Sequence, residues 1–215
     1  MSQSLRSYEE LFEKELVPTA QALQQYLLDI LEDEQRVDIV SARAKSPSRF
    51  AAKAAKCDLD GVPKYTNPRY QIQDQIGARI NVLYLADVDR ISTVIEEYFP
   101  SIETSKKEPD NDAEFGYFGR HFILALPDDV TPEKTDPTFP KFFELQIKTL
   151  FQHAWSEAHH DLGYKSVREL SASERREIAF SSAQSWGADQ VFDALAKKLV
   201  QGYSPSALDE EEQEA

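Results

Sequence analysis

The segment from Phe142 to Lys148 constrains the fold most strongly, because from Phe143 onward its side chains alternate between apolar and polar. The apolar positions are Phe143, Leu145 and Ile147, and the polar positions are Glu144, Gln146 and Lys148. Such alternation is typical of a β-strand, whose successive side chains point to opposite faces of a sheet. The apolar residues around the segment disfavour a fully exposed strand. The polar face is therefore expected to be either an exposed edge or the wall of a site.

The rest of the chain is expected to form helices and strands around this one, with no internal repeat and no linker that divides the core. Strands are predicted over 37–45, 78–85 and 120–126. Helices are predicted over 5–34 with a kink at Pro18 and over 149–162. Three further helices are predicted from their N-caps: from Ser46, with Pro47 at the first helical position, to near Cys57; from Asp87 to Tyr98 or Phe99; and from Ser171 or Ser173 to about Val200. The pattern predicts an α+β fold, in which helices flank a small mixed sheet of about five strands and further helices lie at both ends.

Composition and charge limit the class of protein to which the chain belongs. Hydrophobic residues make up 41% and charged residues 29%, as in ordinary globular domains. No apolar run reaches the roughly 18 residues of a membrane span, and no secretory signal is visible. We therefore expect no membrane association, and the single cysteine, Cys57, suits a reducing cytoplasm. The net charge of −14 argues against a long polyanion as ligand, whereas the locally basic segment 36–79 indicates an anionic ligand or a solvated face.

Neither of the glycine-rich phosphate-binding motifs, G-x-x-x-x-G-K-[ST] and G-x-G-x-x-G, occurs in the chain. A bound phosphate would therefore depend on side chains and a metal ion. Asp74, which precedes a glycine and a predicted strand, is a candidate Mg²⁺ ligand, because hard cations prefer carboxylate oxygens. A turn or helix-end carboxylate is the alternative interpretation. Glu144, on the polar face of its strand, is the second candidate.

Two further segments carry groups that could take part in chemistry. His153, Glu157, His160 and Tyr164 recur at helical spacing and share one face of a helix. The absence of H-E-x-x-H argues against a zinc protease, and a helical histidine is otherwise a structural hydrogen-bonding residue. In the segment 115–121, glycines near Tyr117 leave room for a base to stack on its ring, although a turn with core aromatics would have the same sequence.

Five groups of residues, taken in order, resemble the synthetase domain of the RelA/SpoT family over roughly 36–165. They are Arg43-x-Lys45-Ser46 with Lys53; Asp74-x-x-Gly77-x-Arg79; Gly116-Tyr117-x-x-x-His121; Glu144-x-Gln146-x-Lys148-Thr149; and Trp155 with His160 and Tyr164-Lys165. By length and motif content the chain is similar to the small alarmone synthetases. The resemblance implies a nucleotidyltransferase-like fold and a pyrophosphokinase. Such an enzyme moves the β,γ-pyrophosphate of ATP to the 3′-hydroxyl of GDP or GTP, giving ppGpp or pppGpp and AMP.

The resemblance also implies roles for individual residues. Asp74 would hold Mg²⁺, and Glu144 would share the metal or take the proton from the 3′-hydroxyl. The residues implied for ATP are Arg43, Lys45, Ser46, Lys53 and Arg79. The residues implied for the acceptor are Tyr117, which would stack on guanine, with His121, Gln146, Lys148, Lys107 and His160.

The same resemblance implies an organisation for the whole chain. We expect an N-terminal helix over 1–35, a synthetase core over 36–166, a C-terminal helical region over 167–202 packed on that core, and an acidic disordered tail over 203–215. Relatives form homotetramers, so a homo-oligomer is a further implication.

Two positions depart from the family pattern, and both belong to the acceptor side. Gly119 stands where the family has serine, and Lys148 stands where it has arginine, which removes a bidentate guanidinium fork. The altered motifs leave two alternatives open: a toxic relative that pyrophosphorylates the 3′ end of tRNA or adenosine nucleotides, and an inactive nucleotide-binding module. The overall acidity disfavours tRNA, and the presence of both Asp74 and Glu144 disfavours the inactive module.

Overall fold

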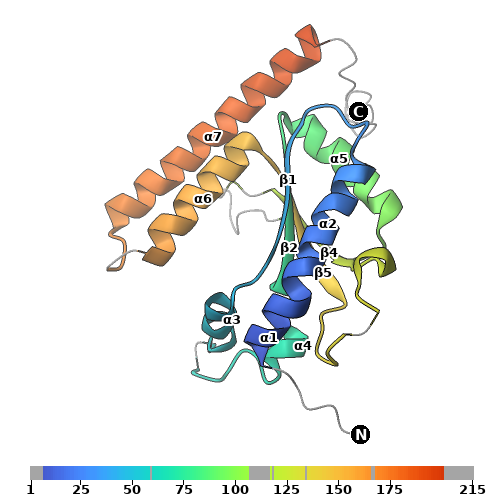
Figure 1. The fold of residues 1–215 in the computed structure, drawn as a ribbon. Coiled ribbons are helices and arrows are strands. Elements are labelled where there is room, and N and C mark those ends of the chain that lie inside the picture. Colours follow the sequence, from blue (N-terminus) through green and yellow to red (C-terminus); the bar gives the residue numbers. More distant parts are fainter. Residues whose placement is uncertain are drawn as a thin grey trace, which may run out of the picture.

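A five-stranded mixed sheet forms the centre of the molecule (Figure 1). The structure is a computed structural model that describes residues 7–58, 60–106, 117, 119–133, 135–165 and 168–200. The strands are β1 (Val37–Ala44), β2 (Ile76–Val82), β3 (Ser101–Lys106), β4 (Arg120–Ala125) and β5 (Phe142–Thr149), in the spatial order β1-β2-β5-β4-β3. Strands β2 and β5 are parallel, and the other three pairings are antiparallel. The predicted mixed sheet is confirmed.

The edge strand β3 is the strand that the sequence analysis missed among those the structure describes. Its sequence, SIETSK, has no apolar alternation, and Ile102, its one large apolar residue, is 58% exposed. Because the strand contributes almost nothing to the core, hydrophobic periodicity could not reveal it. It is held by backbone pairing with β4 instead.

Different helices cover the two faces of the sheet (Figure 1). Helices α2 (Val17–Ile30) and α5 (Leu85–Tyr98) pack on one face, and α6 (Leu150–Lys165) and α7 (Ala172–Leu199) form a hairpin on the other. The short helices α3 (Pro47–Ala54) and α4 (Pro68–Gln71) follow β1 and precede β2. Single 3₁₀ turns lie at Gln73–Gln75 and Asp128–Val130. No helix in the described ranges is both long and apolar enough to cross a membrane.

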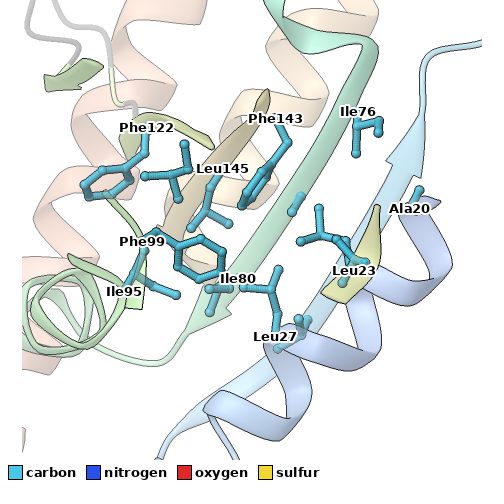
Figure 2. Close-up of a cluster of buried hydrophobic side chains, with 14 of the residues drawn as sticks. Ala20, Leu23, Leu27, Ile76, Ile80, Ile95, Phe99, Phe122, Phe143 and Leu145 are labelled. Carbon is cyan, nitrogen blue, oxygen red and sulfur yellow. The ribbon is translucent and has the colours of Figure 1, made fainter. Parts of the chain in front are cut away.

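The hydrophobic core lies between the sheet and helices α2 and α5 (Figure 2). The apolar positions of β5 that the sequence analysis singled out, Phe143, Leu145 and Ile147, are all fully buried in it. The ring of Phe143 packs edge-to-face on that of Phe99, with centroids 5.6 Å apart. The opposite side chains of β5 therefore face α6 and α7, and the polar face is a partly covered wall.

The N-terminal helix differs from the prediction in how it accommodates Pro18. Helix α1 (Tyr8–Leu11) runs through a π-helical turn (Phe12–Leu16) into α2, so the helical run spans 8–30. In that turn the amide of Val17 donates to the carbonyl of Phe12. A proline has no amide and clashes with the carbonyl four residues earlier. The wider turn immediately before Pro18 relieves both problems.

Two predicted helix caps have different outcomes. Ser171 caps α7 and forms a capping box with Glu174, as one of the two predicted starts requires. Asp87, however, is not the N-cap of α5, which begins at Leu85. Asp87 lies at the third helical position, where its carboxylate accepts from the amide of Tyr84 and from the guanidinium of Arg36. The cap prediction was wrong because an aspartate in the first turn satisfies the same free amides from inside the helix.

Replacing Phe143 by alanine is expected to lower the free energy of unfolding by about 3–5 kcal/mol. The ring is fully buried and its removal leaves a cavity beside Phe99. Leu199→Ala is the control, because Leu199 is 77% exposed on α7 and its truncation should change stability by less than about 0.5 kcal/mol. Urea unfolding measures the stability of both variants. Equal losses of stability would mean that Phe143 does not lie in the core.

Candidate active site

The polar face of the sheet collects side chains from four strands because the strand registers align them. Gly77 of β2 pairs with Glu144 of β5, and Arg79 pairs with Gln146. Arg43 of β1 pairs with Gly77, and His121 of β4 pairs with Gln146. Paired residues in adjacent strands share a face. Residues predicted separately for the donor and for the acceptor therefore lie on one continuous surface.

Asp74 lies between two lysines at the beginning of this surface. It belongs to the 3₁₀ turn that leads into β2, and the backbone of Lys45 is tied to that turn through the carbonyl of Gln75. The Lys45 Nζ atom lies 2.8 Å from Asp74 Oδ2, and the Lys53 Nζ atom lies 2.9 Å from Asp74 Oδ1. Three residues predicted for metal and ATP thus form one charged cluster, and all three side chains are partly exposed.

Ser46 has a structural role in this cluster. Its Oγ accepts a hydrogen bond from the amide of Arg49 and caps helix α3. Pro47 occupies the first turn of the same helix, as predicted. The cap fixes the helix that carries Lys53 toward Asp74, so Ser46 acts on the site through helix placement.

Glu144 is held by two neighbours on the same face. Its Oε1 atom lies 2.9 Å from Nδ1 of His121 and 3.1 Å from Nε2 of Gln146. The His121 side chain is buried and the Glu144 side chain remains 22% exposed. The structure thus brings Glu144, Gln146 and His121 together, as the resemblance implies. A carboxylate fixed by two donors is positioned as a hydrogen-bond acceptor.

Arg79 reaches across to helix α6. Its Nη1 lies 3.1 Å from Nδ1 of His153, and its Nη2 lies 2.9 Å from Oε1 of Glu157. The shared helix face of His153 and Glu157 was visible in the sequence, but its sheet partner was not. Arg43, on the same face, is exposed as a whole residue. Partial desolvation of its guanidinium lowers its pKa, and the charges of Arg49 and Arg79 lower it further.

Tyr117 lies under helix α7. Only 8% of the residue is exposed, and its hydroxyl donates to Oδ2 of Asp189 at 2.6 Å. Thr149, which caps α6 in a capping box with Gln152, donates its own hydroxyl to the same oxygen at 2.5 Å. Asp189 was missed by the sequence analysis, and an aspartate within a helix gives no sign of buried partners. The ring of Tyr117 is therefore largely covered and is not open for stacking.

The two departures from the family pattern, Gly119 and Lys148, touch each other. A Cβ atom on Gly119 would overlap the carbonyl of Ile147 and would come within 2.5 Å of the Cγ atom of Lys148. Lys148 is 4% exposed, and its Nζ donates to Oγ of Ser156 on α6 at 3.1 Å. Its ammonium is thus directed to α6. Of the remaining predicted acceptor residues, His160 is exposed on α6, and Lys107 lies outside the described residues.

Asp74 and Glu144 supply carboxylate oxygens of the kind that a divalent cation binds. In the parts of the chain that the structure describes, no group of three or more His, Cys, Asp or Glu side chains forms a closed metal cage. Mg²⁺ commonly uses one or two carboxylates together with substrate phosphates and water. Asp74 and Glu144 fit that requirement, with Gly77, which has no side chain, beside Glu144 in the register.

The chain belongs to the RelA/SpoT family. The family described as "Region found in RelA / SpoT proteins" matches residues 42–169, more than half of the chain. The match contains every described residue that the sequence analysis assigned to the site. No curated protein matches the chain in sequence.

Solved structures of small alarmone synthetases share the fold. A GTP pyrophosphokinase family protein from Streptococcus pneumoniae is 20% identical, with a TM-score of 0.68, over 85% of this chain and 91% of that one. Small alarmone synthetase 1 from Bacillus subtilis bound to its product pppGpp is 19% identical, with a TM-score of 0.68, over 86% and 96%. The same synthetase bound to AMPCPP is 17% identical, with a TM-score of 0.62, over 86% and 94%. The predicted α+β architecture is confirmed.

Gly119→Ala is expected to destabilise the fold by about 2–4 kcal/mol, because the new methyl group meets a backbone carbonyl that cannot move away freely. Gly187→Ala is the matched control. Gly187 lies within α7 with open space around its Cα, so alanine should stabilise the helix by roughly 0.5–1 kcal/mol. Thermal and urea unfolding of both variants would show shifts of opposite sign. Equal shifts would mean that β4 and β5 separate readily at this point.

Asp189→Asn is expected to gain stability relative to the wild type as the pH rises. Burial raises the pKa of Asp189 above its ordinary 3.8, against hydrogen bonds from Thr149 and Tyr117 that lower it. A carboxyl group with a raised folded-state pKa favours the fold when protonated, and that contribution is lost as the pH rises through the pKa. Asparagine keeps an acceptor for both hydroxyls without the charge. Urea unfolding of both proteins from about pH 4 to about pH 8 would measure the difference in their free energies of unfolding. A difference that stayed constant or shrank as the pH rose would contradict the prediction.

Proposed function

We propose that this protein transfers the β,γ-pyrophosphate of ATP to the 3′-hydroxyl of GDP or GTP, producing ppGpp or pppGpp and AMP. The observation that carries the proposal is the cluster of Asp74 with Lys45 and Lys53, beside the strand pair that carries Arg79 and Glu144. Family membership supports the reaction class. Solved relatives bound to pppGpp and to AMPCPP support nucleotides as the ligands.

The donor side would bind a triphosphate by exchanging ion pairs. Lys45 and Lys53 neutralise Asp74 through Nζ–Oδ distances of 2.8 and 2.9 Å. Phosphate oxygens arriving with a cation would attract both ammonium groups and leave the carboxylate to the cation. Arg43 and Arg79 extend the same face and could stack on the adenine while their charges meet phosphate.

Mg²⁺ would be held by Asp74 and shared with Glu144. When bound, the ion would neutralise part of the charge that the pyrophosphoryl group carries during transfer. Glu144 has the surroundings of a proton acceptor, because His121 and Gln146 hold its carboxylate in place. It would take the proton of the 3′-hydroxyl as that oxygen attacks the β-phosphorus of ATP. The bond between the β-phosphorus and the oxygen bridging to the α-phosphate then breaks, and AMP leaves with that oxygen.

The identity of the acceptor depends on the residues of the acceptor side. Tyr117 would have to uncover its ring before a guanine could stack on it, since only 8% of the residue is exposed. The ammonium of Lys148 is engaged by Ser156. These two features favour testing tRNA and adenosine nucleotides beside guanosine nucleotides. We further propose a cytoplasmic, homo-oligomeric enzyme whose core is 36–166.

The proposal predicts that Asp74→Asn and Glu144→Gln each lower transfer from γ-labelled ATP by at least about 100-fold, because each removes a charge from the reacting centre. The assay would offer Mg²⁺ with GDP, GTP, AMP or tRNA in turn and would follow the label. Circular dichroism and urea unfolding would show that the variants fold.

Asp38→Asn is the matched control, because Asp38 is exposed at the far end of β1 from Asp74 and should leave transfer unchanged. Wild-type turnover in the Asp74 or Glu144 variant would disprove the assigned roles. Label on tRNA alone would show that tRNA, and not GDP or GTP, is the acceptor. Transfer to none of the four would disprove the proposed reaction.

A further inference from the structure

We propose that His153 and Glu157 of helix α6 are positioning residues for the donor nucleotide, which hold the Arg79 guanidinium so that its flat face is presented to the adenine of ATP. The inference rests on the proposed use of ATP. It assigns a role to a pair of residues that the reaction scheme above does not use.

The two contacts of Arg79 involve the edge of its guanidinium group. All five N–H bonds of that group lie in one plane, so hydrogen-bond acceptors approach the edge and leave the two faces to stacking partners. His153 meets Nη1 at 3.1 Å and Glu157 meets Nη2 at 2.9 Å. Two different nitrogens are thus fixed at once, which restricts both translation and rotation of the plane. The side chain of Arg79 remains 20% exposed and that of Glu157 is 55% exposed, so water screens this ion pair in part.

Glu157 also balances the positive charge of the donor side. Arg49 and Arg79 both act electrostatically on Arg43, and Glu157 interacts with Arg43 as well as with Arg79. Partial burial raises the pKa of Glu157, but the charges of Arg79, His153 and Arg43 bring it below its usual 4.5, so the carboxylate is ionised at neutral pH. Without it, like charges would drive the arginines of β1 and β2 apart.

His153 performs its part only as a neutral ring. Nδ1 must carry no proton to accept a hydrogen bond from Arg79, so the proton resides on Nε2. Burial and the charges of Arg79 on β2 and Lys148 on β5 lower the pKa of His153, against a raising effect of Glu157 on the same helix. Below that pKa the ring would become a cation facing two others, and the Arg79 contact would break. ATP binding should therefore weaken under acid conditions through this group.

The test is titration calorimetry of the full chain with AMPCPP and Mg²⁺, alongside KM for ATP and for the acceptor. Glu157→Gln should weaken AMPCPP binding and raise the ATP KM by roughly 3- to 5-fold, with kcat and the acceptor KM changed by less than about twofold. Glu97→Gln, exposed on α5 across the sheet, should match the wild type. The double variant Arg79→Ala/Glu157→Gln should bind no more weakly than Arg79→Ala alone, because both changes remove one interaction.

His153→Asn supplies a second measurement that a structural role would not affect. Asparagine keeps an acceptor but does not titrate, so binding near pH 7.5 should stay within about threefold of the wild type. We expect the wild type to lose AMPCPP affinity on acidification to about pH 5.5, and this loss should be reduced in the variant. An equal loss in both proteins would overturn the role of His153.

The outcomes separate this inference from the proposed function. If the wild type does not bind AMPCPP, the proposed use of ATP fails. If the wild type binds and Glu157→Gln binds equally well, the proposed function stands and the positioning role is wrong. Additive losses in the double variant, or an acceptor KM that rises together with the ATP KM, would also overturn the positioning role.

Discussion

The parallel pairing of β2 with β5 is the constraint on which the rest of the structure depends. Strand β5 is the central strand of the five and β2 is one of its two neighbours, and each buries one full face against α2 and α5. The register sets Gly77 beside Glu144 and Arg79 beside Gln146. Because side chains alternate at every residue, a slip of one residue in either strand would put its charged residues into the core. The hydrophobic face of the sheet thereby fixes the arrangement of the polar one.

Helices partly cover the charged side chains of that polar face, and a partly buried charge is stabilised by a partner. Asp74 has two lysines, Arg79 has a histidine and a glutamate, and Glu144 has a histidine and an amide. Each group is thus oriented before a ligand arrives, which lowers the ordering cost of binding. These contacts would respond differently to a ligand. A triphosphate with its cation would replace the lysine contacts of Asp74, whereas an adenine would leave the edge contacts of Arg79 in place.

The sequence predicted those parts of the molecule that depend on local pattern. The alternation in β5, the Ser46 cap before Pro47 and the cap of the last helix each involve neighbours in the chain. The structure confirms the first two and selects Ser171 from the two predicted caps, Ser171 and Ser173. The β3 strand escaped prediction because it buries almost no apolar surface. The partners of Arg79 and Tyr117 escaped for another reason: Glu157 and Asp189 lie 78 and 72 residues away along the chain, and only the tertiary packing of α6 and α7 selects them.

The contact between Gly119 and Lys148 changes how the acceptor side should be understood. Considered separately, the two positions are independent replacements of a serine and an arginine. In the structure, the Lys148 stem passes where a side chain on residue 119 would begin, and the Ile147 carbonyl occupies the remaining room. A serine at 119 would require β5 to move away from β4 at this point, and that movement would shift the neighbouring Gln146 and the His121 opposite it. The side chains that residues 119 and 148 can carry are therefore coupled through the backbone of β5, so substitutions at these two positions are not expected to be additive.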